Sequence, residues 1–265
     1  MSDKKRLFSE KYGPFALIAG GSDGLGAAFS EALARRGLNL VMMARNKERL
    51  EAAAARLREQ YGVEVKTLAA DLADFENAQS LIAELNVAIG LLVYNAAFAP
   101  IGLFENTSGE DLSLAAMVNV RTPLLLAKML SAPMIEKKRG GIVLMSSLAG
   151  AQGSPKLASY AATKAFNAVL AEGLWKEMQA HGIDVVGCCA GAIITPGYQQ
   201  AEKKAKNAPG TMTARNVAEQ TLQALGKGPI VIPGGVNKLA RFVLTRLLTR
   251  NAAIGIMAQN TGGLS

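Results

Sequence analysis

The sequence predicts an α/β protein built on one doubly wound parallel sheet, with helices on both faces. Short apolar stretches alternate with longer amphipathic stretches along the 265 residues. The short stretches are continuously apolar, as strands covered on both faces are. Because helices separate these strands, the strands are expected to run parallel. No linker rich in Pro, Gly or Ser divides the chain, so a single domain over residues 1–265 is expected.

About seven strands and the helices between them can be placed along the chain. The expected strands are 15–19, 40–43, 63–69, 90–94, 141–145, 183–189 and 229–232. The expected helices, recognised by their apolar spacing, are 25–36, 47–61, 75–85, 111–137, 157–180 and 213–225. Residues 195–212 show no clear period and are expected to form a lid. Residues 236–265 are expected to form an extension, a basic helix with an apolar face followed by a soft tail.

Composition excludes several classes of protein. Half of the residues are hydrophobic and 19% are charged, which allows a large core and excludes wholesale disorder. A single histidine argues against zinc chemistry and serine–histidine hydrolysis, so no metal is expected. The two cysteines, Cys188 and Cys189, are adjacent and too few for a disulfide framework. Because no stretch looks like a signal peptide or a transmembrane segment, a cytoplasmic protein is expected.

Positive charge is concentrated towards the C-terminal end. The net charge is +8, and residues 201–265 hold nine Lys/Arg and two Glu. No basic cluster is interleaved with aromatic residues, so nucleic acid is not an expected partner. A solvated basic surface is the simplest interpretation. An anionic substrate group, an acidic partner and a lipid surface are the alternatives.

A glycine-rich turn follows the first strand. The segment AGGSDGLG at 19–26 has the spacing G-x-x-x-G-x-G and opens directly into a helix. Glycine permits a tight turn and lets a pyrophosphate reach the backbone amides at a helix N-terminus. The expected cofactor-binding residues of this turn are Gly20, Ser22, Asp23, Gly24, Leu25 and Gly26. The same segment matches the hydrolase pattern G-x-S-x-G, but that chemistry needs a histidine base, and His181 looks like the end of a helix.

The end of the second strand indicates which dinucleotide is bound. An acidic residue there would bind the adenosine ribose, whereas an arginine would bind a 2′-phosphate. The chain has Arg45 at this point and no acid before Glu48. NADP(H) is therefore the expected cofactor, with Ser22 and Asn46 beside Arg45. A surface arginine that begins a helix is the alternative interpretation.

Tyr160 and Lys164 are spaced to share one face of a helix. A free phenol has a pKa of about 10, too high for ready proton exchange at neutral pH. A lysine charge about 4 Å away, at an effective dielectric constant near 20, would contribute roughly 4 kcal/mol, or about three pKa units. The pair therefore predicts a phenol whose pKa is lowered enough for general acid–base catalysis.

Two further polar residues precede this pair. Ser147 ends the expected fifth strand, at the edge of the sheet where ligands dock. Asn119 lies in an apolar helical segment, where a buried amide needs a partner. Each residue also has a structural interpretation, Ser147 as a helix cap and Asn119 as a buried structural amide.

In their order and joint spacing, these residues resemble the short-chain dehydrogenase/reductase family over about residues 12–200. The resemblance includes the glycine turn, Asp71 in DLAD at 71–74, NAA at 95–97, and the set Asn119, Ser147, Tyr160 and Lys164. It implies a Rossmann-like fold and hydride transfer between a nicotinamide cofactor and a carbonyl or an alcohol.

The resemblance also implies roles for individual residues. Tyr160 would donate the proton in reduction, and Ser147 would hydrogen-bond the carbonyl oxygen. Lys164 would lower the phenol pKa and hold the nicotinamide ribose, while Asn119 would support a water relay. Asp71 and Leu72 would flank the adenine, Asn95 and Ala96 would lie near the cofactor ribose, and Ile193 and Thr195 would contact the nicotinamide. The chain departs from the family pattern at Ala19, Asp23, Tyr94, Ala97 and Ala190, none of which is a reactive group.

A closer resemblance suggests the substrate class. The segments KYG at 11–13, SDG at 22–24 and EQYGVEV at 59–65 look like the branch of NADP-dependent hydroxysteroid dehydrogenases and long-chain 3-oxoacyl-CoA reductases. This implies lipid metabolism and a lipophilic ketone or secondary alcohol, with a hydroxysteroid ahead of a 3-oxoacyl thioester of CoA or an acyl carrier. The expected substrate pocket is Ser147, Ala149, Pro155, Tyr160, Gly191, Ala192 and Tyr198. A homodimer or homotetramer is expected, and a non-catalytic NADP-binding sensor is the alternative of another class.

The C-terminal helix has an apolar face between basic residues. The apolar positions are Leu239, Phe242, Val243, Leu247 and Leu248, and the basic ones are Lys238, Arg241, Arg246 and Arg250. Core or subunit packing is the simplest interpretation. Peripheral contact with a membrane would need more apolar area than one short helix offers, and closure over a lipophilic ligand is the third interpretation.

Overall fold

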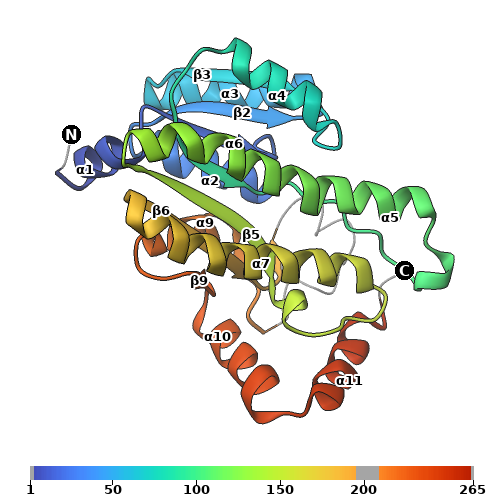
Figure 1. Cartoon of the computed structure of the whole chain (residues 1–265). Helices are drawn as coiled ribbons and strands as arrows, with labels where there is room; N and C mark the ends of the chain where they lie inside the picture. The colour runs from blue at the N-terminus through green and yellow to red at the C-terminus, as the bar shows by residue number, and fades with distance from the viewer. Residues whose placement is uncertain (1–2, 195–208, 264–265) are drawn as a thin grey trace.

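A seven-stranded parallel sheet forms the centre of the protein in the computed structural model, which describes residues 3–194 and 209–263 (Figure 1). The strand order is β3–β2–β1–β4–β5–β6–β9, and every neighbouring pair is parallel. The strands are β1 Phe15–Ala19, β2 Asn39–Ala44, β3 Val65–Ala69, β4 Ile89–Tyr94, β5 Gly140–Ser147, β6 Ile183–Ala190 and β9 Ile230–Val231. The predicted doubly wound α/β fold is confirmed.

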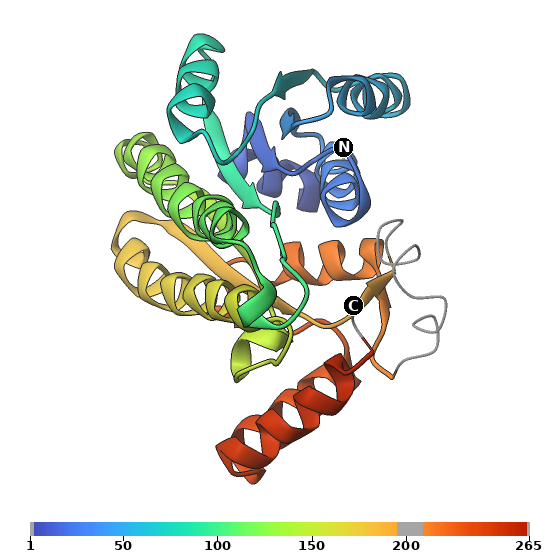
Figure 2. The same ribbon diagram turned by 90° about the vertical axis from the view of Figure 1, so that its right-hand side faces the viewer.

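Helices cover both faces of this sheet (Figure 2). On one side lie α2 Gly24–Ala34, α3 Lys47–Tyr61 and α9 Ala214–Ala224. On the other lie α4 Phe75–Glu84, α6 Thr122–Glu136 and α7 Ala158–Met178. A hydrophobic core lies on each face of the sheet, and successive residues of a strand point to opposite faces. Ile18 therefore packs with the first group of helices and Leu17 with the second.

The strands lie where they were predicted, although several ends differ. β3 begins at Val65 rather than at residue 63, because Gly62 ends α3 in a left-handed conformation and the next two residues complete the turn. β5 and β6 run further than predicted, to Ser147 and Ala190, which are partners in the sheet register. Their longer ends carry Ser147 to the edge of the sheet where the strands finish.

The predicted helix 111–137 begins two residues earlier and is interrupted. α5 Gly109–Ala116 leads into one π-helical turn, Met117–Arg121, and then into α6. The whole helical stretch Gly109–Glu136 includes α5, the π-helical turn and α6. By length and composition alone, this stretch could cross a membrane, with a mean hydropathy of 1.2. Its inner side packs Leu126 and Leu130 into the core beside the sheet, and core helices of this kind pass the same test, so it is weak evidence for a membrane span.

Two features of the described structure were not predicted from the sequence. α1 Asp3–Tyr12 was not predicted, because it is mostly polar and is tied down by the distant Asp184, which binds Lys11 and Tyr12. A two-stranded sheet joins β7 Ile193–Ile194 to β8 Met212–Thr213. Most of the predicted lid, residues 195–208, lies outside the described residues.

The expected soft tail is wrong. After α10 Gly235–Phe242 and a π-helical turn Val243–Leu247, the chain forms another helix, α11 Arg250–Thr261. Thr249 caps this helix by accepting a hydrogen bond from the backbone N–H of Ala252 at 3.3 Å. The buried side chain of Ala253 fixes the helix to the rest of the protein. The two helices form an angled pair at the bottom of Figure 1.

Candidate active site

A cavity of about 720 Å³ opens at the carboxyl ends of the strands. It lies where the strand order reverses, because β1 pairs with β2 on one side and with β4 on the other. Ligands of doubly wound sheets bind at such a crossing point. Of the predicted residues, the cavity is lined by Gly20, Ser22, Asp23, Gly24, Leu25, Arg45, Asp71, Leu72, Asn95, Ala96, Tyr160, Gly191, Ala192 and Ile193.

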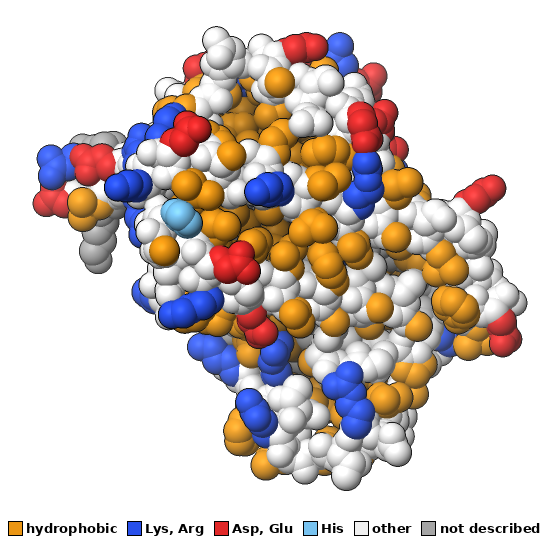
Figure 3. Space-filling model, viewed as in Figure 1, with side chains coloured by type: hydrophobic (Ala, Val, Ile, Leu, Met, Phe, Trp, Pro, Cys, Tyr) orange, Lys and Arg blue, Asp and Glu red, His pale blue; other side chains and the backbone are white. Residues whose placement is uncertain are grey.

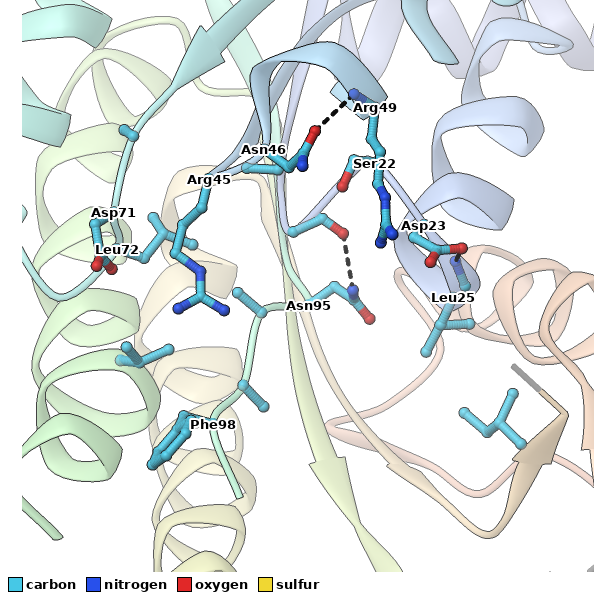
Figure 4. A pocket seen from close by; sticks show the side chains of 18 of the residues that line it. Ser22, Asp23, Leu25, Arg45, Asn46, Arg49, Asp71, Leu72, Asn95 and Phe98 are labelled. Atoms are coloured by element: carbon cyan, nitrogen blue, oxygen red, sulfur yellow. Dashed lines mark hydrogen bonds between the residues drawn. The ribbon is translucent and has the colours of Figure 1, made fainter. Parts of the chain in front are cut away.

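The glycine turn is packed tightly enough to need its glycines. Gly20 has a φ of +81°, and a Cβ on Gly26 would overlap the carbonyl oxygen of Gly20. The Asn95 side chain donates to that same carbonyl at 3.1 Å, a contact visible in Figure 4. Asp23 caps α2, since its carboxylate accepts from the Gly24 N–H at 2.6 Å. The turn therefore holds the N-terminus of α2 at the floor of the cavity.

Two arginines point into the cavity from the end of β2 and the start of α3 (Figure 4). Arg45 directly follows β2, and Arg49 extends toward Ser22 and Asp23. Neither forms an ion pair with any residue of the described ranges. Asn46 lines the same cavity, and its Oδ1 also caps α3 by accepting from the backbone N–H of Arg49 at 2.8 Å. Arg49 was missed in the sequence, although the first turn of a helix after β2 faces this edge of the sheet.

Tyr160 and Ser147 meet at another part of the cavity. Tyr160, in the first turn of α7, lines the cavity and hydrogen-bonds the Ser147 hydroxyl at the end of β5. The Ser147 Oγ also accepts from the backbone N–H of Ala149 at 3.2 Å. Ser147 therefore caps the 3₁₀ helix Leu148–Ala151, which is the structural interpretation considered for it, and it is also a hydrogen-bond partner of Tyr160.

The pKa of Tyr160 differs from the sequence expectation. Burial raises the pKa of its phenol above the ordinary value, and the hydrogen bond with Ser147 offsets this in part. The Lys164 ammonium lies 5.5 Å from the centre of the Tyr160 ring and donates to the carbonyl oxygen of Met145 at 3.0 Å. Because Lys164 is itself buried, its own pKa falls to about 8. The lowered phenol pKa predicted from their spacing is therefore wrong for this state of the protein.

Asn119 lies on the π-helical turn and is fully buried. Its Oδ1 accepts from the Phe98 N–H at 2.8 Å, and its Nδ2 donates to the Phe98 carbonyl at 2.7 Å and to Thr163 Oγ1 at 3.1 Å. Phe98 lines the cavity. Asn119 thus fixes the loop after β4 against α7, which is the structural interpretation considered for it.

Asn167 is a second buried amide at this place, and it was not predicted from the sequence. Its Nδ2 donates to the Asn119 carbonyl at 2.9 Å, whereas its Oδ1 has no hydrogen-bond partner among the described residues. A residue one turn after Lys164 on the same face was the available signal.

Some predicted pocket residues lie elsewhere. Pro155 lines a separate cavity of about 420 Å³ with Arg250 and Ile254, because the 3₁₀ turn Leu148–Ala151 carries the chain away from the first cavity. The lining of the main cavity does not include Gly26, Asn119, Ser147, Ala149 or Lys164. Thr195 and Tyr198 lie outside the described residues.

The fold and this arrangement of residues define a nucleotide-binding oxidoreductase of the doubly wound class. A family model for short chain dehydrogenases matches residues 14–206. The chain therefore belongs to the short-chain dehydrogenase family, and it is an enzyme of the dehydrogenase/reductase kind.

The relatives of this chain include hydroxysteroid dehydrogenases and 3-oxoacyl-CoA reductases. A 7beta-hydroxysteroid dehydrogenase of Clostridium sardiniense is 30% identical over 233 residues, which are 87% of this chain and 89% of the relative. A very-long-chain 3-oxoacyl-CoA reductase of Phaeosphaeria nodorum is 32% identical over 238 residues, which are 86% of this chain and 66% of the relative.

Solved structures agree with this assignment. One of a 7beta-hydroxysteroid dehydrogenase has a TM-score of 0.87 at 29% identity, covering 94% of this chain and 98% of that one. A short-chain dehydrogenase from Sphingobium yanoikuyae in complex with NADPH has a TM-score of 0.78 at 31% identity, covering 92% and 95%.

Proposed function

We propose that this enzyme interconverts a lipophilic ketone and a secondary alcohol with NADP(H), and that a hydroxysteroid is the type of substrate. The observation that carries the proposal is that one cavity is lined by two arginines without an ion-pair partner among the described residues and by a tyrosine hydrogen-bonded to a serine. Arginines at the end of β2 suit a 2′-phosphate, while the hydroxyl pair suits a carbonyl oxygen. The name of the Clostridium relative and the NADPH complex of the Sphingobium structure support the proposal.

The cavity residues fit a dinucleotide along its length. Backbone amides after the glycine turn, at Leu25 and Gly26, would hold the pyrophosphate. Arg45 and Arg49 would hold the 2′-phosphate, and Asp71 and Leu72 would flank the adenine. The nicotinamide and its ribose would be held by Asn95, Ala96, Lys164, Ile193 and Thr195. When bound, the nicotinamide would supply the hydride.

Tyr160 and Ser147 would bind the carbonyl oxygen of the ketone together. Both hydroxyls can donate to that oxygen, which becomes negatively charged as the carbonyl is reduced. Since burial raises its pKa, Tyr160 keeps its proton at neutral pH and would act as the general acid in reduction. Asn119 would position this pair through Phe98, and a water held near the buried Asn167 Oδ1 would link it to solvent.

The pKa of Lys164 gives a pH dependence. In the proposed mechanism the charged form of Lys164 is the one that supports catalysis. Because the pKa of Lys164 is about 8, this charged form is present below pH 8 and is lost above it. We expect kcat/KM for ketone reduction to be level below pH 8 and to fall above it, because kcat/KM follows the free enzyme.

Lys164→Arg tests this assignment, since arginine stays charged to far higher pH. The variant should be slower, but the fall near pH 8 should disappear from its profile. A wild-type profile that stays level to pH 10 would contradict a role for the Lys164 proton.

A 3-oxoacyl thioester is the second candidate substrate. The Phaeosphaeria relative supports it, as does the strongly basic C-terminal part, where no Asp or Glu follows Glu219. A phosphopantetheine phosphate or an acidic carrier protein would be attracted to that charge. NADPH oxidation with a panel of steroid ketones and a panel of 3-oxoacyl thioesters separates the two candidates. Turnover of thioesters alone would overturn the hydroxysteroid proposal.

We further propose that two copies of the chain pair through α6 and α7. Apolar side chains gather over these helices in Figure 3. Leu124 on α6 and Val169 on α7 are 40% and 66% exposed, and Met117 on the π-helical turn before α6 is 42% exposed. An apolar patch of this kind favours subunit contact. We expect Val169→Arg to lower the molar mass measured by light scattering from that of an oligomer towards that of a monomer. Leu7→Arg, on the exposed side of α1, is the matched control, and an unchanged mass for Val169→Arg would contradict the pairing.

A further inference from the structure

Asn237, on α10, is a buried amide held among three glycines from different segments. The residue is 5% exposed. A Cβ on Gly191 would lie 2.7 Å from Asn237 Oδ1, a Cβ on Gly210 would come still closer, and one on Gly234 would lie 3.3 Å from Nδ2. Gly210 and Gly234 also have φ values of +85° and +86°. Because these three residues are glycines, there is space for the Asn237 amide. A side chain at any of the three positions would fill that space.

The amide also joins these segments by hydrogen bonds. Its Nδ2 donates to the carbonyl oxygen of Gly210 at 3.0 Å and to that of Pro233 at 2.9 Å. Gly210 leads into β8, which pairs with β7, and the Met212 N–H donates to the Ala192 carbonyl at 3.0 Å. Asn237 thus fixes both strands of the small sheet, through Gly191 before β7 and through Gly210 before β8.

This small sheet forms one wall of the cavity. Gly191, Ala192 and Ile193 line the same cavity as Tyr160. Arg45 follows β2, and Gly191 follows β6, which is four strands further along the sheet. At a spacing of about 4.8 Å between strands, roughly 19 Å separates these two places. Asn237 therefore supports the end of the cavity that is remote from the arginines.

We propose that Asn237 is a positioning residue for the nicotinamide half of the cofactor. The proposal rests on the proposed function, which places the adenosine half at Arg45 and Arg49. Asn237 touches no part of the cofactor in this account and acts through Gly191, whose backbone carries the wall at Ala192 and Ile193. Loss of the amide should weaken the binding of the nicotinamide half and leave the adenosine half unaffected.

Asn237→Asp removes the amide donor with almost no change in shape. A carboxylate cannot donate to the carbonyl oxygens of Gly210 and Pro233, so the contacts become repulsive. Calorimetry should show NADPH binding weakened by about tenfold or more, with adenosine 2′,5′-bisphosphate binding changed by less than about twofold. Asn251→Asp, an exposed amide on α11, is the control with the same change of charge.

Different outcomes overturn different proposals. Equal weakening of both ligands, or of neither, would overturn the role of Asn237. Failure of the wild-type protein to bind the bisphosphate would overturn the NADP(H) proposal and this inference with it. Thermal unfolding of each variant shows whether the protein is folded at the temperature of the titration.

A second comparison tests the contact itself and does not depend on Asn237→Asp folding. Gly191→Ala places a methyl group against Asn237 Oδ1, so NADPH binding should weaken by about tenfold. In an Asn237→Ala background the amide is gone, and the same change should cost much less. Additive losses in this double-mutant cycle would show that Gly191 and Asn237 are not coupled and would overturn the inference.

Discussion

Tyr160→Phe is expected to reduce kcat for ketone reduction by roughly 100- to 10,000-fold, which is the usual contribution of a general acid. The change removes one oxygen, which lines the cavity and bonds Ser147. Because the ring remains, NADPH binding should be almost unchanged. Steady-state kinetics together with calorimetric titration of NADPH separates the two effects.

Tyr61→Phe is the control for this substitution. That phenol binds Glu31 at 3.1 Å on α2 and lies outside the cavity lining, so its loss should leave turnover intact. If Tyr160→Phe retained full activity, the proton-donor role would be wrong. If the wild-type enzyme bound NADPH but turned over no ketone, alcohol or thioester, the alternative of a non-catalytic sensor would be favoured.

Replacing both Arg45 and Arg49 with alanine is expected to weaken NADPH binding by about 100-fold and NADH binding by less than about threefold. Each charge-assisted contact to a phosphate contributes about 1.5 kcal/mol where solvent has access, and each 1.4 kcal/mol is a factor of ten. The two cofactors differ by the 2′-phosphate, so the difference between their losses measures contact with that group. Titration of both cofactors into each variant gives the two values.

Arg56→Ala controls for the loss of one positive charge in each single variant, since Arg56 is exposed on the same helix as Arg49 and lies outside the cavity lining. Equal losses for NADPH and NADH would contradict a phosphate site at these arginines. A loss confined to Arg45→Ala among the single variants would remove Arg49 from the site. The Asp23 carboxylate nearby does not prevent this binding in our account, because it is engaged as the cap of α2.

Local patterns in the sequence were sufficient to predict most of the fold. Buried parallel strands are continuously apolar, and the helices between them keep a helical period, so the sheet could be placed within a few residues. α1 and α11 were missed because contacts with distant residues hold them, among them the bond of Tyr12 to Asp184. The π-helical turn at Asn119 has no local signature either.

The candidate site was predictable where spacing alone brings residues together. The glycine turn, Arg45 and Tyr160 line one cavity because each follows the carboxyl end of a strand or begins the next helix. Pro155 was misplaced, since nearness to Ser147 in sequence does not reveal the turn of the chain after β5. The pKa of Tyr160 was mispredicted because pairwise spacing includes the lysine charge but not the burial of both groups.

Asn237 could not have been found from its local pattern, and for Asn167 the only local signal was its place one turn after Lys164 on the same helix. The position of Asn167 in the site depends on its hydrogen bond to the carbonyl of Asn119, 48 residues away. The role proposed for Asn237 depends on its hydrogen bond to the carbonyl of Gly210, 27 residues away, and on its packing against three glycines. Amides of this kind look like ordinary polar residues on a helix until the tertiary structure places a partner beside them.

Transfer of deuterium is the most direct test of the central claim, that NADP(H) bound in this cavity reduces a lipophilic ketone. NADPH carrying deuterium in both positions at the reactive carbon of the nicotinamide would be mixed with the enzyme and a steroid ketone, and the alcohol would be analysed by mass spectrometry. The account predicts one deuterium on the carbinol carbon, and much slower formation of the alcohol when labelled NADH replaces NADPH. An unlabelled alcohol, no alcohol, or equal rates with the two cofactors would contradict it.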